Sequence, residues 1–254
     1  MRLRVLSVGG SVGPDSDVSC FLLGDKILLD AGSAASTLSQ SEQDKLHDIL
    51  ITHPHMDHVR DLPFLCENLF GRIDHSLIVH GARNTIDCLR QDLFNGRLWP
   101  DFTTLPAESP ILRLHEFESG EPFSLDGLEV LAIEMPHLGG SVGFLLESET
   151  GALAISGDTG PDSSFWEMLL PYLDRLRGIL IECSFPDRLE NLALKSGHLC
   201  PRLMRSEIDR APRADIPIYV YAIKGPSKNE TIEEIMSWAN GDVEILEAGR
   251  VLEF

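Results

Sequence analysis

The sequence predicts a protein of mixed α and β structure, of the α/β (α+β) class, on three observations. Short runs rich in Val, Ile and Leu end at glycine-bearing turns, which is typical of strands. Segments with apolar residues at helical spacing lie between several of these runs. A cluster of histidine and aspartate side chains follows one expected strand directly, at residues 53–58. The 254 residues suffice for one large domain, and we expect a single domain over 1–254.

The first half of the chain alternates expected strands and helices. Strands are predicted at 2–8, 18–23, 26–29, 48–52 and 77–80, with a hairpin across Gly24-Asp25 and a loop at 9–17. Helices are predicted at 39–47, 59–69 and 84–94. In the last of these, Thr85, Leu89 and Leu93 share one side, and Asn95-Gly96 ends it.

The second half contains further strands, three helices and a closing hairpin. The expected strands are 111–117, 121–123, 128–135, 141–147, 152–156, 178–183 and 216–223. The expected helices are 164–177, 202–209 and 229–238. Residues 244–254 are predicted to close the chain as a terminal hairpin.

The motif His53-Pro54-His55-Met56-Asp57-His58 has the composition of a metal site. Imidazole nitrogens and carboxylate oxygens suit zinc and similar divalent ions. Pro54 excludes both a helix interior and a central strand, so His53 and His55 lie in extended chain and can point the same way. Asp57 and His58 then open a helix. Two pairs of ligands leaving in two directions suit two metals about 3.5–4 Å apart. The alternative is a polar turn with three surface histidines.

Composition narrows the classes of partner. The formal net charge of −19 repels nucleic-acid phosphates at long range, so a long nucleic acid is not an expected partner. The five cysteines are scattered and lack a Cys-x-x-Cys pair, which is typical of reduced thiols, and we expect a cytoplasmic protein. Neither a signal peptide nor a membrane-spanning run of about 18 apolar residues is visible.

The histidine motif resembles the signature of the metallo-β-lactamase fold, a four-layered αββα sandwich. That superfamily holds lactamases, glyoxalase II, ribonuclease Z and class II cyclic-nucleotide phosphodiesterases. The motif is specific for the superfamily and says almost nothing of the substrate. The resemblance implies a divalent metal cofactor, with Zn²⁺ expected and Mn²⁺ or Fe²⁺ as alternatives, in one or two copies.

Three residues outside the motif fit the superfamily pattern. His137 ends a strand before Leu138-Gly139-Gly140, where the resemblance implies a third histidine ligand, although a lone histidine could simply cap the turn. Asp158 follows strand 152–156, and the resemblance implies that it bridges the two metals. Many true β-lactamases carry cysteine or histidine there, which argues against antibiotic hydrolysis. Asp30, in Asp30-Ala31-Gly32, is either an ordinary turn residue or a residue beneath the site that orients the histidine loop.

Further segments resemble class II cyclic-nucleotide phosphodiesterases: Trp99-Pro100, Ser156-Gly157-Asp158-Thr159, Glu182-Cys183-Ser184-Phe185-Pro186 and Ser196-Gly197-His198-Leu199. His198 precedes a helix, where it could contact a phosphate oxygen or protonate a leaving group, or merely cap the helix. Trp99 could form a pocket wall on which a base stacks, or a buried corner of the core. Lys224 could neutralise a substrate phosphate or be a solvated lysine.

One position departs from that family. The family ends the last strand with His-Ile/Leu-Lys-Pro, whose histidine completes the second metal site, whereas this chain has Tyr221-Ala222-Ile223-Lys224-Gly225. A methyl group cannot coordinate a metal. We expect weaker occupancy of the second site, with Asp57, His58 and Asp158 retained and water or His198 filling the gap.

The leading hypothesis is a metal-dependent phosphodiesterase that converts a 3′,5′-cyclic nucleotide to a nucleoside 5′-monophosphate by a metal-activated hydroxide. The expected metal ligands are His53, His55, Asp57, His58, His137 and Asp158, with catalytic roles for Asp57 and His198. A ribonuclease Z-like nuclease would need a basic face. A glyoxalase of type II would need an added C-terminal helical domain, and a lactonase or thioesterase is a related alternative. A non-catalytic binding homologue is the non-enzyme alternative, motivated by Ala222. A homodimer is possible in each case.

Overall fold

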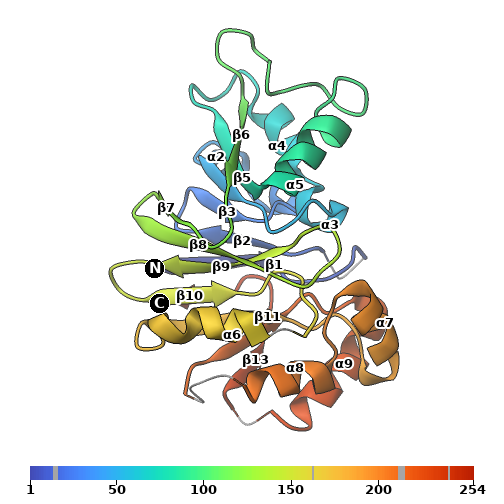
Figure 1. The fold of residues 1–254 in the computed structure, drawn as a ribbon. Coiled ribbons are helices and arrows are strands. Elements are labelled where there is room, and N and C mark those ends of the chain that lie inside the picture. Colours follow the sequence, from blue (N-terminus) through green and yellow to red (C-terminus); the bar gives the residue numbers. More distant parts are fainter. Residues whose placement is uncertain (14–16, 162, 211–214, 240) are drawn as a thin grey trace.

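Two seven-stranded sheets face each other in the computed structural model, which describes residues 1–13, 17–161, 163–210, 215–239 and 241–254 (Figure 1). The expected loop at 9–17 therefore falls partly outside the described residues. The first sheet has the order β14-β1-β2-β3-β4-β5-β6. Its strands are β14 Val251–Glu253, β1 Arg2–Ser7, β2 Cys20–Leu23, β3 Ile27–Leu29, β4 Asp48–Leu50, β5 Leu77–Ala82 and β6 Leu112–Phe117.

The second sheet has the order β13-β12-β11-β10-β9-β8-β7. Its strands are β7 Pro122–Leu125, β8 Leu128–Glu134, β9 Val142–Glu147, β10 Ala152–Ile155, β11 Leu176–Glu182, β12 Ile218–Tyr221 and β13 Val243–Ile245. β10 to β13 are parallel, and β3 to β6 of the first sheet are parallel as well. The carboxyl ends of several strands therefore open on the same edge of each sheet.

Backbone contacts join these two edges. The amide of Val142, at the start of β9, donates to the carbonyl of Thr52, just after β4, at 3.0 Å. Gly9, after β1, forms an isolated bridge with Ile223, after β12. Loops that follow strands of different sheets thus lie side by side, which is where ligands bind in open α/β sheets.

Helices cover the outer face of each sheet. Those beside the first sheet are α1 Ala34–Thr37, α2 Gln40–Gln43, α3 Met56–Val59, α4 Leu62–Leu69 and α5 Arg83–Cys88, which continues as a π-helical turn at Leu89–Leu93. Those beside the second are α6 Ser163–Leu169, α7 Glu190–Ser196, α8 Pro201–Ile208 and α9 Lys228–Met236, with short 3₁₀ turns at Leu170–Tyr172, Asp187–Leu189 and Gly225–Ser227. The predicted αββα sandwich is confirmed.

Three apolar clusters hold these layers together. One joins the first sheet to its helices, a second lies between the sheets, and a third joins the second sheet to its helices. In β4, Ile49 packs in the first cluster and Leu50 in the second, so this strand is buried on both faces. Parallel strands that are covered on both faces need apolar side chains at successive positions, which explains the apolar run in the sequence of β4.

The closing hairpin predicted at 244–254 is wrong. β13 pairs in parallel with β12 in the second sheet, whereas β14 pairs antiparallel with β1 in the first. Each segment has three residues, and each extends the edge of a different sheet. Their partners lie far away in sequence, so local pattern carries no information about which edge each strand joins.

The predicted helix at 164–177 is too long, and two helices, α1 at Ala34–Thr37 and α7 at Glu190–Ser196, were not predicted. α6 ends at Leu169 and a 3₁₀ turn follows, because Pro171 lacks the N–H that a continuing α-helix needs. Leu176 already belongs to β11. Among the described residues, none of the helices has the length and hydrophobicity needed to span a bilayer.

Candidate metal centre

Histidines and an aspartate from four separate segments meet at the edge where the two sheets join. His53 and His55 follow β4, His58 lies in α3, His137 follows β8, and Asp158 follows β10. Three groups have ligand atoms within 4.8 Å of one another: His53 with His55 and His137, His53 with His58 and Asp158, and His137 with Asp158 and His198. These groups share members, so they form one centre.

Three imidazoles point their nitrogens at a common place. Nε2 of His53 lies 2.9 Å from Nδ1 of His55, and Nε2 of His137 lies 3.2 Å from the same atom. The far nitrogen of His137, Nδ1, donates to the carbonyl of Gly197 at 2.7 Å. This bond fixes the tautomer of the neutral ring, so the Nε2 lone pair of His137 faces the other two rings. Outer hydrogen bonds of this kind are characteristic of metal-binding histidines.

Burial keeps these three rings uncharged. Desolvation lowers the pKa of His53 well below its usual value, and the neighbouring His58 lowers it further. Burial also lowers the pKa values of His55 and His137. Neutral imidazole is the form that binds a metal, so the environment prepares the rings for coordination.

Asp158 lies between the histidine groups. Its Oδ2 is 3.5 Å from Nε2 of His58, 3.8 Å from Nε2 of His53 and 4.0 Å from Nε2 of His137. Its Oδ1 is buried and has no hydrogen-bond partner in the described part of the chain. An unpaired buried carboxylate oxygen costs about 1–3 kcal/mol or more. A divalent cation at this place would compensate that cost, so the residues present fit a bound metal.

Asp30 orients one of these histidines. Its carboxylate accepts hydrogen bonds from the amide of Thr52 at 2.9 Å and from Nδ1 of His58 at 2.6 Å. Burial alone would lower the pKa of His58, but the carboxylates of Asp30 and Asp158 outweigh it and raise that pKa well above its usual value. The φ of Asp30 is +55°, in the left-handed region that aspartate tolerates better than most residues. Asp30 thus lies beneath the site and touches the ring of His58 from behind.

Asp57 reaches the centre less closely. It lies in the first turn of α3, its side chain is 34% exposed, and its Oδ2 is 3.8 Å from Nε2 of His58. It belongs to none of the three convergent groups found among the described residues. A modest rotation of the side chain would be needed for it to coordinate beside His58.

His198 pairs with the buried carboxylate of Glu182, a residue for which the sequence predicted no role. Nδ1 of His198 lies 2.7 Å from Oε1 of Glu182 and 3.8 Å from Oδ2 of Asp158. Glu182 is completely buried, and desolvation raises its pKa despite the opposing effect of His198. Burial would lower the pKa of His198, but Glu182 outweighs it and raises that pKa. The sequence feature that could have predicted a role for Glu182 is its position as an acidic residue at the end of a largely apolar strand.

The second nitrogen of His198 is left free. Ser184 Oγ lies 3.2 Å from Nδ1 of His198, so Ser184, Glu182 and Asp158 all approach the same nitrogen of the ring. Nε2 has no hydrogen-bond partner among the described residues, and it is not completely shielded from solvent. The ring can therefore offer Nε2 to a molecule that enters the site.

Lys224 lies beside this histidine, joined to it through an aromatic ring. Its Nζ donates to the carbonyl of Gly10 at 3.1 Å and lies 5.6 Å from the ring centroid of Phe185. The Phe185 ring in turn lies 5.5 Å from the ring of His198. The positive charge of Lys224 is thus held near the Glu182–His198 pair.

Trp99 lies in a different environment. It is partly buried against the cluster between the first sheet and its helices, with its ring 5.2 Å from that of Phe64. In the described part of the chain, none of its contacts reaches the histidine cluster. Its position corresponds to the alternative of a core corner, and a role in stacking a base remains a prediction.

Ala222 stands in a tightly held segment. It is buried, its φ is +61°, and its carbonyl accepts from Ser184 Oγ at 3.2 Å. A Cβ on Gly10 would lie 2.3 Å from that carbonyl oxygen. The segment is therefore fixed by close backbone approach, and the Ala222 side chain offers no ligand atom.

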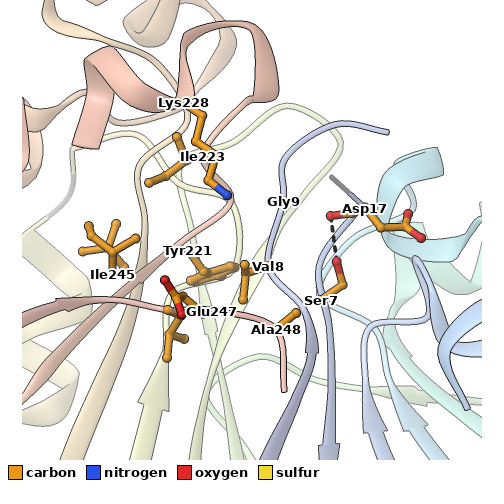
Figure 2. Close-up of a pocket in the computed structure, with 12 residues that line it drawn as sticks. Ser7, Val8, Gly9, Asp17, Tyr221, Ile223, Lys228, Ile245, Glu247 and Ala248 are labelled. Carbon is orange, nitrogen blue, oxygen red and sulfur yellow. Dashed lines mark hydrogen bonds between the residues drawn. The ribbon is translucent and has the colours of Figure 1, made fainter. Parts of the chain in front are cut away.

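Two hollows open near the ends of the strands. One, of about 250 Å³, lies between the ends of β1 and β12, and Figure 2 shows Lys228 on one side of the Tyr221 ring and Glu247 on the other. The other, of about 390 Å³, lies between the ends of β5 and β6 and the turn from β8 to β9. The second cavity adjoins the metal centre, because Gly140 on its wall follows Gly139, whose added Cβ would lie 3.2 Å from Nε2 of His55.

Comparison with known proteins agrees with this geometry. Residues 25–214 match the model of the β-lactamase superfamily domain. A 3′,5′-cyclic-nucleotide phosphodiesterase of Aliivibrio fischeri is 26% identical over 238 residues, which cover 76% of this chain and 70% of that protein. A probable 3′,5′-cyclic-nucleotide phosphodiesterase of Yersinia pestis is 28% identical over 204 residues, which cover 70% of this chain and 57% of that protein. The chain thus spans little more than half of the second relative.

Solved structures show the same fold. Unliganded yeast PDE1 superposes with a TM-score of 0.85 at 18% identity, covering 100% of this chain and 99% of that one. Zn²⁺-bound PqqB from Methylobacterium extorquens superposes with a TM-score of 0.70 at 15% identity, covering 100% of both chains. The family match spans most of the sequence, and the histidine and aspartate cluster could hold a divalent metal. The chain belongs to the β-lactamase superfamily and is a metal-dependent hydrolase of the metallo-β-lactamase fold.

Proposed function

We propose that this protein hydrolyses a small phosphodiester, with a 3′,5′-cyclic nucleotide as substrate and a nucleoside 5′-monophosphate as product. The observation that carries the proposal is the convergence of three neutral imidazoles and Asp158 beside a buried Glu182–His198 pair. The names of the relatives from Aliivibrio fischeri and Yersinia pestis support this substrate class.

The metal ligands divide into two sets. In the proposal, His53, His55 and His137 hold one divalent ion, and Asp57 and His58 hold a second. Asp158 lies between the sets and serves both. We propose zinc, because nitrogen ligands predominate and zinc accepts imidazole together with carboxylate. When bound, divalent ions supply a nucleophilic water at neutral pH and withdraw charge from phosphoryl oxygens.

The protein's own groups act on the leaving side of the phosphate. Glu182 holds Nδ1 of His198, so a protonated ring presents Nε2–H to an incoming oxygen. In our proposal His198 gives this proton to the departing 3′ oxygen, as a general acid. Lys224, held near the same ring through Phe185, offsets negative charge on the phosphate. Asp30 keeps the His58 ring in position throughout.

The test is a substrate panel with metal analysis on the same sample. Purified protein supplied with zinc or manganese is assayed with cyclic AMP and cyclic GMP, and the nucleotide product is identified by chromatography. We expect turnover to the 5′-monophosphate. A folded, metal-loaded protein that leaves both nucleotides intact would contradict the proposal. Precursor tRNA, a thioester and a lactone in the same panel test the ribonuclease Z-like and esterase alternatives, and the charge of −19 speaks against the first.

Ala222 favours one second candidate, a homologue that binds a nucleotide without turning it over. The residue offers no ligand atom, and the second ligand set then rests on Asp57, His58 and Asp158. Metal counting per chain separates the candidates, because two tightly held ions indicate an enzyme and none indicates a binding protein. Ala222→His adds an imidazole at the position. A rise in metal content together with activity would show that the natural second site is weak.

A further inference from the structure

The cavity of about 390 Å³ opens on the same edge as the metal centre and is assigned to no function above. We call it the β5–β9 cavity, because its walls come from the ends of β5, β6 and β8 and the start of β9. Its volume lies within the range of small-molecule sites. Its polar lining consists of Arg83, Asn84, Glu118, Ser119, Glu134 and Ser141.

A short strip of backbone separates this cavity from the metal ligands. Asn84 lines the cavity, and its Nδ2 donates to the carbonyl of Gly139 at 2.5 Å. Gly140 lines the cavity as well. On the other side of the strip, a Cβ placed on Gly139 would lie 3.2 Å from Nε2 of His55. A molecule whose phosphate lies at the histidines can therefore extend past two glycines into the cavity.

The charged side chains that line the cavity determine which part of such a molecule can bind there. Two carboxylates, Glu118 and Glu134, and one guanidinium, that of Arg83, line the cavity. Neither carboxylate forms an ion pair with any residue that the structure describes, whereas Arg83 lies 4.0 Å from Asp87. Unpaired carboxylates accept hydrogen bonds from O–H and N–H groups and repel a further anion.

We infer that the β5–β9 cavity binds the uncharged sugar and base of the substrate, while a single phosphate lies at the metal centre. This inference rests on the proposed function and narrows it. The ribose hydroxyl and the amino groups of a base would donate to Glu118 and Glu134. A second phosphate, as in a dinucleotide, would meet two carboxylates and is excluded.

Ser119→Trp tests the location, because it fills the cavity without touching a metal ligand. We measure kcat and KM with cyclic AMP and with bis(p-nitrophenyl) phosphate, a diester without sugar or base. The variant should raise KM for cyclic AMP at least tenfold, leaving kcat for the second diester and the metal content unchanged. Ser41→Trp, on the exposed face of α2, is the matched control. An unchanged KM for cyclic AMP in Ser119→Trp would overturn the inference.

The charge selection has its own test. The unmodified protein should favour cyclic AMP over cyclic di-AMP at least tenfold in kcat/KM. The double variant Glu118→Lys, Glu134→Lys should have a smaller ratio of kcat/KM for cyclic AMP to kcat/KM for cyclic di-AMP. A preference of the unmodified protein for the dinucleotide would refute the selection.

Failure of the proposed function is recognised separately. If neither diester is turned over, binding of adenosine is measured by NMR on the unmodified protein and on Ser119→Trp. If adenosine binds the unmodified protein but not Ser119→Trp, the cavity is a nucleoside site in a protein without phosphodiesterase activity. Adenosine that binds both proteins equally, or neither, refutes the assignment of the cavity.

Discussion

Oε1 of Glu182 lies 2.7 Å from Nδ1 of His198, which joins the end of β11 to the segment before α8 inside the protein. Glu182→Gln keeps the shape but removes the charge that supports a protonated His198. We expect kcat to fall about 10–100-fold, the range typical of residues that orient a functional histidine. His198→Asn removes the proton donor, and we expect a loss of about 10²–10⁴-fold.

The control for this pair is His75→Asn. His75 contacts the carbonyl of Leu46 just before β5 and β4 begin, at the end of these strands opposite to the metal centre. Steady-state kinetics with cyclic AMP, together with metal content, checks all three variants. Full activity in His198→Asn would remove the general acid from the mechanism.

The convergent ligands should be required for metal binding. Asp158→Asn and His137→Ala each remove a group that contacts two of the three ligand clusters. We expect each variant to lose at least one ion per chain by plasma mass spectrometry. Chelation should lower the melting temperature of the unmodified protein, because a metal that binds only the folded state stabilises it. An unaltered metal count in both variants would disprove the ligand assignment.

Asp30 should affect the metal chiefly through His58, its shortest contact. Asp30→Asn keeps the size of the side chain but weakens the 2.6 Å contact with Nδ1 of His58. We expect metal affinity to fall about 10–100-fold. Asp61→Asn is the matched control, because Asp61 is also buried and accepts from the amide of Ser36 at 3.0 Å, with no histidine in contact. Isothermal titration with zinc measures both; equal losses in the two variants would indicate a purely structural effect.

Gly10 should be intolerant of any side chain. A Cβ at this position would lie 2.3 Å from the backbone oxygen of Ala222, and backbone cannot give way as a flexible side chain can. Gly10→Ala should lower the free energy of unfolding by about 2 kcal/mol, within the range for overpacking. Gly13→Ala is the control, because no atom of the residues that the structure describes lies within 4 Å of its added Cβ. Urea denaturation measures both; equal stability of the two variants would contradict the close approach.

Glu42 should contribute a pH-dependent part of the stability. Hydrogen bonds from Ser39, followed by the contact with Arg4, lower the pKa of Glu42 to about 2. A depressed pKa means that the contribution is fully present above the usual value near 4.5 and is lost as the pH falls toward 2. Because a third of the side chain (33%) is exposed and solvent screens the charge, we expect Glu42→Gln to cost only about 0.5–1 kcal/mol at pH 7.

Urea denaturation at pH 7 and at pH 3 measures the Glu42 effect. The difference between Glu42→Gln and the unmodified protein should shrink at the lower pH. A difference that grows on acidification would show that the Ser39 and Arg4 contacts do not stabilise the charged form.

The sequence by itself determined the class of fold and predicted most of the residues that the structure brings together in the histidine and aspartate cluster. The run before Thr52 predicted a buried strand, and Pro54 predicted the extended turn that lets His53 and His55 face one way, because these are properties of short stretches of chain. His137 and Asp158 were recognised as residues at strand ends, and the resemblance to the superfamily supplied their joint role. The assignment of catalytic roles to Asp57 and His198 remains a prediction.

Only the tertiary structure decided which residues support the ligands and which lie elsewhere. Glu182 reaches His198 because β11 lies beside β10, a relationship that no local pattern contains. Trp99 packs against Phe64 and not against the histidines, since the partner of an aromatic ring depends on packing between distant segments. β13 and β14 join different sheets for the same reason. Local sequence preferences determine helices, strands and turns, whereas a site of this kind depends on contacts between segments that lie far apart in the sequence.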